Sequence, residues 1–459
     1  MAKIAFVDKT GCLNSVAWTC LKEGHDVVYW IQDKKYSKIG DGLVPKVDNE
    51  KEVIDFNPDV VYVYQDPHRV ISLTSKHLVA YGSTLLASKL EDERFYAVSL
   101  ARTYNLKTPT TFRFDKIDEI SDFLDTREGK KEWVFKTEGK DNGTSTHVTE
   151  SDEHLRAILN FEKDSKDTKS FILQERIEGI EVSIEGWFDY RLSPPRGPWI
   201  QPINSTIERK RLLPGDVGPM TGCMFSLVWA WPGQRPKLFR QTLEKMTPHL
   251  TKIKYIGPID GNFIIDYMTR TPYFLEWTPR LGWNAFEAFM YGLSEPYTVG
   301  EFLVNLGKGD LHNYKLNNDY LGVVRLYAPT APGMPIFAPY DIDKRLFPKD
   351  VYVDNQQLRV VGCNSIHNMS VIMEAAAGGH TVKEATREIY EDVIPQVITT
   401  DLIYRNDLCE VADDIELLEE WGYITKKERD THDYRPLPPM SQYVSVEDSQ
   451  ADQDPPVTS

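Results

Sequence analysis

The chain has 459 residues, more than one typical domain, and its 41% hydrophobic and 27% charged residues are typical of a soluble enzyme. Its formal net charge of -16 excludes a protein that coats nucleic acid through a broad positive surface. The sequence contains no run of about eighteen apolar residues, so no membrane span is expected. The N-terminus lacks the pattern of a signal peptide. Five cysteines without CxxC spacing argue against a disulfide framework or a zinc site and predict a reducing cytoplasm.

The first ninety residues alternate short β-rich runs with a helical stretch. The pattern predicts strands at 3–8, 26–31 and 59–64, with a helix at 14–23 between the first two. Such alternation is typical of a parallel sheet with crossover helices. The turn at 8–11 has backbone N–H groups that an anion could bind, but with Gly11 as its single glycine an ordinary strand-to-helix turn is the favoured interpretation.

A lysine at the end of a buried strand is the first sign of a phosphate site. After a helix at 89–104, a strand at 111–114 and a helix at 117–124, a strand ends in Lys136 and leads into a loop rich in glycine and hydroxyl side chains, 139–146. Loop amides and hydroxyls can bind phosphate oxygens while the lysine supplies positive charge. The alternative is a β-hairpin with an exposed glycine-rich turn.

Two carboxylates on a predicted hairpin suggest a metal site. The sequence predicts two strands within 171–187 and a helix at 237–247 that ends at Pro248. They are followed by two apolar strands that flank a Thr-Arg-Thr-Pro turn. Asp266 and Glu276 stand on these strands, and paired carboxylates on apolar strands favour a hard divalent cation. Partly solvated edge acids are the alternative.

The last third of the chain predicts further elements and then an extension. Helices are expected at 294–306 and 382–394, and strands at 320–327 and 358–363. After Trp421 several prolines predict a flexible tail, and residues 410–459 carry 13 acidic and 4 basic side chains, so much of the negative charge belongs to a partly disordered C-terminal extension.

In this order the elements resemble the ATP-grasp ligases, most closely the glycinamide ribonucleotide synthetases (phosphoribosylamine-glycine ligases). The likeness covers residues 1–410 and is carried by these segments: Val-Phe-Lys at 134–136, Leu-Gln-Glu-Arg-Ile-Glu-Gly-Ile-Glu at 173–181, Lys-Arg-Leu-Leu-Pro-Gly-Asp-Val-Gly-Pro-Met-Thr-Gly-Cys-Met at 210–224, Glu-Trp-Thr-Pro-Arg-Leu-Gly at 276–282, and the stretches 320–333 and 380–390. The lysine-arginine stretch is the most specific of them, and its glycine- and proline-rich part is interpreted as a loop that shapes an acceptor pocket.

This resemblance implies an α/β fold of several domains. The expected parts are an N-terminal parallel-sheet substrate domain, an ATP-grasp domain with a lid lobe at about 110–185, a small C-terminal domain and the acidic extension: 1–88, 89–310, 311–410 and 411–459.

The resemblance also implies a set of site residues. ATP would be bound by Arg94, Lys136, Gly139, Gly143, Thr144, Ser145, Glu175, Arg176, Ile177 and Glu181. The transferred phosphate would be neutralised by the catalytic residues Lys210, Arg211 and Arg280. Substrate binding would fall to Asp216, Thr221 and Gly222, and Mg²⁺ or Mn²⁺ would be held by Asp266 and Glu276.

Several positions depart from the family pattern, mostly on the acceptor side. The glycine-rich segment that helps bind ribosyl phosphate is replaced at 10–15, and Met220, Cys223 and Thr278 replace an asparagine, a glycine and an asparagine. Arg94 stands where many relatives have lysine. Both Cys12 and Cys223 are interpreted as small buried thiols.

The resulting hypothesis is a cytoplasmic ATP-dependent carboxylate-amine ligase with a diverged acceptor site, acting on small-molecule carboxylate and amine substrates. Two alternatives stay open: a catalytically silent nucleotide-binding scaffold, and a ligase redirected to the amine of a modified nucleotide or a peptide. The oligomeric state cannot be inferred from the sequence.

Overall fold

The computed structural model describes residues 1–126, 132–139, 146–163, 168–192, 197–230, 235–282, 284–293, 296–310, 314–338, 342–363 and 368–425. These residues form two compact units. Of the described residues, unit 1 contains Met1–Ser88, Val182–Asp260 and Thr278–Thr425, and unit 2 contains Lys89–Glu181 and Gly261–Trp277. The change of unit after Ser88 falls at the predicted boundary 1–88, while the predicted three-domain division stays a prediction.

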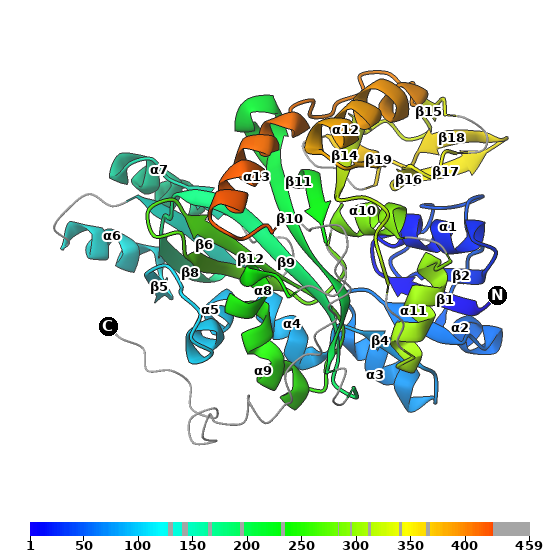
Figure 1. Cartoon of the computed structure of the whole chain (residues 1–459), viewed down its shortest axis with the longest axis horizontal. Helices are drawn as coiled ribbons and strands as arrows, with labels where there is room; N and C mark the ends of the chain where they lie inside the picture. Colours follow the sequence, from blue (N-terminus) through cyan, green and yellow to red (C-terminus); the bar gives the residue numbers. More distant parts are fainter. Residues whose placement is uncertain are drawn as a thin grey trace. The chain divides into compact units, whose positions relative to one another are not determined.

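A four-stranded parallel sheet begins unit 1, with strand order β2-β1-β3-β4 (Figure 1). Its strands are β1 Lys3–Asp8, β2 Asp26–Ile31, β3 Val60–Val63 and β4 Ala80–Gly82, and the helices of this part are α1 Asn14–Lys22, α2 Glu50–Phe56, α3 Pro67–Ser75 and α4 Leu85–Asp92. Every residue of β3 is buried, as expected where both faces of a parallel sheet are covered. The predicted parallel sheet is confirmed.

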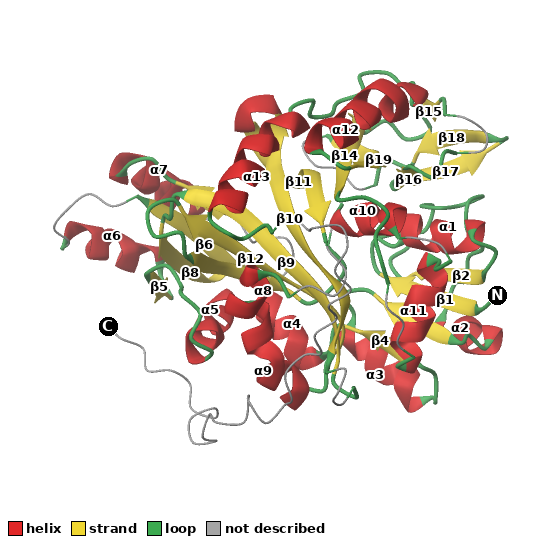
Figure 2. Ribbon diagram, in the orientation of Figure 1, coloured by secondary structure: helices red, strands yellow, loops and turns green. Residues whose placement is uncertain are grey.

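Unit 1 also contains most of a large antiparallel sheet, with the order β9-β10-β11-β14-β19-β16 (Figure 2). Its strands are β9 Gly179–Asp189, which enters the unit at Val182, β10 Trp199–Leu213, β11 Val217–Trp229, β14 Tyr320–Pro329, β19 Met369–Gly379 and β16 Leu346–Pro348. The segment 210–224, interpreted from sequence as a glycine- and proline-rich loop, lies in the long β10–β11 hairpin. Its turn is only Pro214–Asp216, where Gly215 and Asp216 adopt positive φ of 70° and 53°.

The remaining elements of unit 1 lie after these strands or between them. They are the small sheet of β15 Pro335–Ile336, β18 Gln357–Val360 and β17 Val351–Asp354, and the helices α8 Lys237–Gln241, α9 Thr247–Lys252, α10 Ala285–Gly292, α11 Val299–Lys308, α12 Val382–Glu388 and α13 Val411–Glu420. Pro248, the predicted helix stop, instead stands in the first turn of α9, where no intrahelical N–H bond is lost. The helix predicted at 294–306 begins at Val299 because Thr298 and Glu301 form a capping box.

Unit 2 is built on a four-stranded sheet with the order β5-β8-β6-β7. Its elements are β5 Thr111–Phe114, β6 Trp133–Gly139, β7 Thr146–Val148, β8 Thr168–Glu175, the helices α5 Arg94–Thr103, α6 Ile117–Asp125 and α7 Asp152–Glu162, and the paired strands β12 Ile256–Asp266, from Gly261, and β13 Pro272–Thr278, up to Trp277. Apolar side chains of α6 and α7, such as Ile120 and Leu155, pack with Phe135 and Leu173 of the sheet. The helix predicted at 89–104 is interrupted at Glu93, whose φ and ψ of -112° and 82° are not helical.

A buried network of charges connects distant segments of unit 1. Arg325 of β14 donates to Glu374 of the neighbouring strand β19, with Nε 2.9 Å from Oε1. Lys349, between β16 and β17, bonds Glu287 of α10 and lies 3.3 Å from the second oxygen of Glu374. Ser15 of α1 donates to Glu287 at 2.8 Å. Arg325, Glu374 and Glu287 are at most 3% exposed, so their charges depend on one another for compensation.

No helix within the described ranges is long and apolar enough to cross a membrane.

Replacing Arg325 with methionine should lower the free energy of unfolding by about 3–5 kcal/mol, because two buried carboxylates would then share Lys349 alone. Arg113→Met is the matched control, since the Arg113 side chain is 39% exposed and its pair with Asp115 should be worth less than about 1 kcal/mol. Thermal and denaturant unfolding measure both changes. Equal losses in the two variants would contradict the structural role of the network.

Candidate functional site

The lysine predicted to bind phosphate is buried in unit 2. Lys136 on β6 is 8% exposed, and its Nζ donates to Oε1 of Gln174 on β8 at 2.9 Å. Gln174 in turn donates to the hydroxyl of Thr111 at 3.1 Å. A buried ammonium group costs free energy unless it has partners, so this chain of hydrogen bonds fixes the position of the positive charge.

The predicted hinge follows β8 and is held by its own backbone. The N–H of Glu175 donates to the carbonyl of Thr110 at 2.8 Å, and the N–H of Arg176 donates to the carbonyl of Glu132 at 3.0 Å. The Arg176 side chain also pairs with Glu132 at 2.6 Å. An adenine contact at Glu175 or Arg176 would therefore use their carbonyl groups. Of the other two predicted hinge residues, Ile177 precedes β9, and Glu181 lies in it, half-buried.

Arg94 lies beside the strands that border the predicted phosphate loop. It begins α5, and its Nη1 donates to the hydroxyl of Thr146 on β7 at 3.2 Å. The next N–H, of Phe95, donates to Glu138 on β6 at 2.9 Å. Gly139 ends β6, whereas the predicted loop residues Gly143, Thr144 and Ser145 lie outside the described residues.

The predicted catalytic and substrate residues of the β10–β11 hairpin face different surroundings. The Thr221 hydroxyl donates to the carbonyl of Lys210 at 2.8 Å, and Nη1 of Arg211 donates to the carbonyl of Gly218 at 2.8 Å. Gly222 is exposed on β11. Asp216, at the hairpin turn, binds the guanidinium of the buried Arg405 at 2.6 Å, a bond that anchors the turn.

A group of carboxylates that the sequence analysis missed lies near Lys210 and Arg280. Glu185 of β9, Glu208 of β10 and Asp260 of β12 interact electrostatically with one another and with these two cations. Burial raises the pKa of Glu185 to about 7, although the hydrogen bond from Asn204 opposes the shift. Burial also raises the pKa of Asp260 well above its ordinary range, and the charges of Glu185 and Glu208 add to the effect. The sequence signal that could have revealed this group is the presence of Glu185 and Asp260 inside otherwise apolar strands.

The β1–α1 turn does not present free amides to an anion. The carboxylate of Asp8, at the end of β1, accepts the N–H groups of Thr10, Gly11 and Leu13 at 3.0, 2.7 and 2.8 Å. It also accepts the hydroxyl of Tyr29 at 2.5 Å and is fully buried. The chain thus supplies its own anion at this turn, and the interpretation as an ordinary strand-to-helix turn fits the structure better than an anion site.

The two predicted metal ligands of unit 2 are not brought together. Asp266 accepts the N–H of Thr269 at 2.6 Å within the hairpin turn, and its own N–H donates to Thr271. Glu276 stands five positions beyond Thr271, a separation of roughly 17 Å along a strand. One ion cannot bridge that distance, so only Glu276 is retained as a metal ligand in the proposal below.

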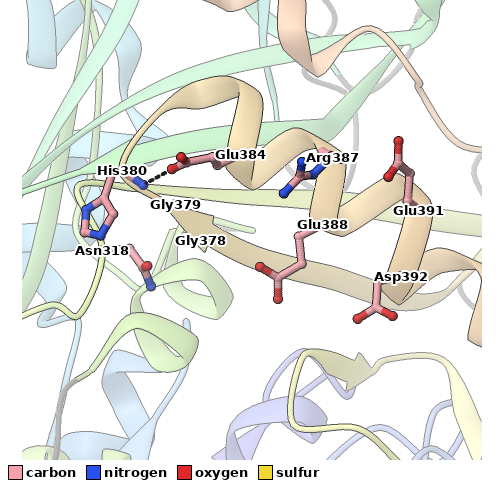
Figure 3. A pocket seen from close by; sticks show the side chains of 9 residues that line it. All are labelled: Asn318, Gly378, Gly379, His380, Glu384, Arg387, Glu388, Glu391 and Asp392. Atoms are coloured by element: carbon pink, nitrogen blue, oxygen red, sulfur yellow. Dashed lines mark hydrogen bonds between the residues drawn. The ribbon is translucent and has the colours of Figure 1, made fainter.

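A separate acidic pocket of about 470 Å³ is found in unit 1 (Figure 3). It lies where β19 leads into α12, and none of the predicted site residues lines it. Glu384 and His380, two of its residues, are joined by the hydrogen bond from the His380 N–H to the Glu384 carboxylate at 2.8 Å, which belongs to the N-terminal cap of α12.

Comparison with known proteins identifies the region around Lys136. Residues 92–283 match the sequence model of the family described as phosphoribosylglycinamide synthetase, ATP-grasp (A) domain. These residues are therefore similar in sequence to an ATP-grasp domain. Over 353 residues the chain is 23% identical to the phosphoribosylamine–glycine ligase of Clostridium acetobutylicum, an alignment that covers 72% of this chain and 79% of that enzyme.

Solved structures share the fold at lower sequence identity. The phosphoribosylamine–glycine ligase of Thermotoga maritima has a TM-score of 0.66 at 18% identity, covering 88% of this chain and 99% of that one. The biotin carboxylase domain of the Hydrogenobacter thermophilus 2-oxoglutarate carboxylase, solved with MgADP, has a TM-score of 0.63 at 12% identity, covering 93% and 100%. The predicted resemblance to the ATP-grasp ligases is confirmed over residues 92–283 by the family model, and the solved structures share the fold of the chain.

Replacing Asp8 with alanine should destabilise the chain by about 3 kcal/mol or more, because three N–H groups, two of them in buried hydrogen bonds, and one buried hydroxyl would lose their acceptor. Tyr29→Phe removes only one of the four donors and should cost about 1–2 kcal/mol. Unfolding measurements on the two variants test the ranking. A smaller loss for Asp8→Ala than for Tyr29→Phe would contradict this account of the turn.

The stability of the chain should fall between about pH 4.5 and pH 7 in a way that depends on Glu185. Its pKa is higher in the folded state, about 7, than in the unfolded state, so its favourable contribution is complete below pH 4.5 and is lost as the pH rises through 7. Glu185→Gln should therefore gain stability over the wild type by up to about 3 kcal/mol at pH 7.5, and little at pH 4.5. Unfolding at both pH values measures the difference, and equal shifts would contradict it.

Proposed function

We propose that this chain is an ATP-dependent carboxylate-amine ligase that forms an amide through an acylphosphate, and that its amine substrate carries no ribosyl phosphate. The ligase chemistry is supported by the ATP-grasp match around the buried Lys136. The observation that carries the change of substrate is the Asp8 carboxylate, which occupies the three amides of the β1–α1 turn that a phosphate would need.

The first step is phosphoryl transfer, for which an enzyme supplies position and positive charge. A carboxylate oxygen of the substrate attacks the γ-phosphorus of ATP, the bond to the β-phosphate oxygen breaks, and ADP leaves. Lys136, fixed by Gln174, would bind the ATP phosphates, and Glu181 would accept the ribose hydroxyls. Lys210, Arg211 and Arg280 would neutralise the charge on the transferred phosphoryl group.

A divalent cation fits one carboxylate of unit 2. Mg²⁺ in nucleotide sites is commonly held by one or two protein carboxylates together with the phosphates. Glu276 on β13 is half-buried and suits this role, whereas Asp266 already accepts an N–H in its turn. When bound, the ion would reduce the charge repulsion between ATP and the attacking carboxylate.

In the second step the amine nitrogen attacks the acyl carbon, phosphate leaves, and the amide retains one proton fewer than the amine brought. Thr221 and Gly222 on β11 would border the acceptor, while Asp216 is engaged by Arg405. The thiols of Cys12 and Cys223 take no part, since burial raises the pKa of each above its ordinary value. Small-molecule substrates and a cytoplasmic location belong to the same proposal.

Incubation with ATP, Mg²⁺ and a panel of carboxylates, with hydroxylamine as trap, should release ADP and form a hydroxamate with at least one carboxylate. Hydroxylamine is largely uncharged at pH 7.5 and captures an acylphosphate directly. Lys136→Ala and Glu276→Ala should each lower the rate at least about 100-fold, as expected when charge stabilisation of the transferred phosphate is lost. Product mass and ADP release are the measurements.

The matched controls are Lys252→Ala and Glu153→Ala, two residues outside the proposed site, which should leave the rate within about twofold. Tight ATP binding without ADP release from any carboxylate would overturn the ligase proposal in favour of a silent nucleotide-binding homologue. Turnover with phosphoribosylamine and glycine as the preferred pair would instead overturn the proposed change of substrate.

A further inference from the structure

Several buried oxygen atoms in unit 1 have no hydrogen-bond donor among the described residues. Two of them, Oε1 of Glu185 and Oδ1 of Asn204, lie on paired residues. Glu185 is 3% exposed and Asn204 is 0% exposed, so exposed solvent does not replace the missing donors. Buried acceptors of this kind are uncommon because each costs free energy, and a specific pair of them calls for an explanation.

The two oxygens belong to neighbouring side chains on adjacent strands. Glu185 of β9 and Asn204 of β10 are directly paired in the antiparallel register. The amide nitrogen of Asn204 donates to Oε2 of Glu185 at 3.2 Å, which holds the two groups together. The backbone N–H of Gly282 also acts on the Glu185 carboxylate, yet Oε1 of Glu185 and Oδ1 of Asn204 have no hydrogen-bond donor.

Two further carboxyl groups act on Glu185. The carboxylates of Asp260 and Glu208 interact electrostatically with Glu185, and Ser183 donates to Asp260. Lys210 and Arg280 are the positive groups that act on these carboxylates. Burial favours the protonated forms of Glu185 and Asp260 while no further cation is bound, and a positive group placed beside them would favour their ionised forms.

We propose that Glu185, Asn204 and Asp260 form the binding site for the ammonium group of the amine substrate. An alkylammonium ion carries one positive charge and three N–H donors, which matches two orphaned oxygens beside a further carboxylate. A divalent metal fits less well, because no group of three or more His, Cys, Asp or Glu side chains within the described ranges is placed to hold a metal ion.

The proposed ammonium site deepens the proposed function and rests on it for the identity of the ligand as substrate. Lys210 and Arg280, which we assign to the transferred phosphoryl group, act on the same carboxylates. The ammonium group would therefore be held near the acylphosphate. One of its protons would pass to the Glu185 carboxylate, and the lone pair that this leaves on the nitrogen would then attack the acyl carbon.

Binding can be tested without knowing the natural amine. The full chain, with MgADP present, is titrated with ethylammonium chloride at constant ionic strength and followed by ligand-observed NMR, with tetramethylammonium as a cation that cannot donate hydrogen bonds. Ethylammonium should bind and tetramethylammonium should not. Glu185→Gln and Asp260→Asn should each weaken the binding at least tenfold, whereas the exposed control Glu420→Gln should leave it unchanged.

The melting temperature separates a binding role from a structural one. Because Glu185 is a buried charge with an unsatisfied oxygen, Glu185→Gln should melt no lower than the wild type at pH 7.5. A lower melting temperature, equal affinity in wild type and Glu185→Gln, or displacement of ethylammonium by Mg²⁺ at equal concentration would each overturn the proposed ammonium site.

Kinetics distinguish this failure from failure of the ligase proposal. Hydroxamate formation by the wild type needs no ammonium site, because hydroxylamine is largely uncharged, and it therefore reports on the ligase proposal alone. If the wild type forms hydroxamate but does not bind ethylammonium, the ammonium site is wrong and the ligase stands. If it binds ethylammonium but forms no hydroxamate, the binding site stands and the ligase is wrong.

Discussion

Compensation of buried charge is the constraint on which unit 1 depends. Arg325, Glu374, Lys349 and Glu287 come from β14, β19, the turn after β16 and helix α10, and none of them is stable in the interior without the others. Because Ser15 adds helix α1 to the same network, the parallel sheet and the antiparallel sheet of this unit have a fixed relation. Close packing of apolar side chains alone would tolerate small shifts between these layers, whereas charge pairs at hydrogen-bond distance do not.

Local signals accounted for much of the fold. The strands of the first sheet were predictable because a parallel sheet covered on both faces needs continuous apolar runs. The β10–β11 hairpin was not, because the residues of 210–224 are polar, glycine-rich and matched a family motif that suggested a loop. Its strand structure depends on pairing with β9 and β14, which are distant in sequence. Likewise, α10 was missed because its short apolar run shows little periodicity.

The residues of the candidate site likewise include some that have a local sequence signal and some that have none. Lys136 was predictable from residue type and local context, since a lysine on an apolar strand before a glycine-rich loop is typical of phosphate sites. Glu185 and Asn204 were not, because their significance comes from a cross-strand pairing and from burial that the linear sequence does not show. Asp266 and Glu276 were grouped for the converse reason: both stand on one hairpin, but strand geometry separates positions that seem equivalent in sequence.

The Asp8 carboxylate keeps the β1–α1 turn ordered without a ligand. Loops that bind phosphate through backbone amides commonly gain order when the ligand arrives, so that part of the binding energy is spent on folding the loop. Here an internal carboxylate keeps Thr10, Gly11 and Leu13 in place at all times. The turn is therefore preorganised, and under the proposed function it would exclude a ribosyl phosphate instead of adapting to it.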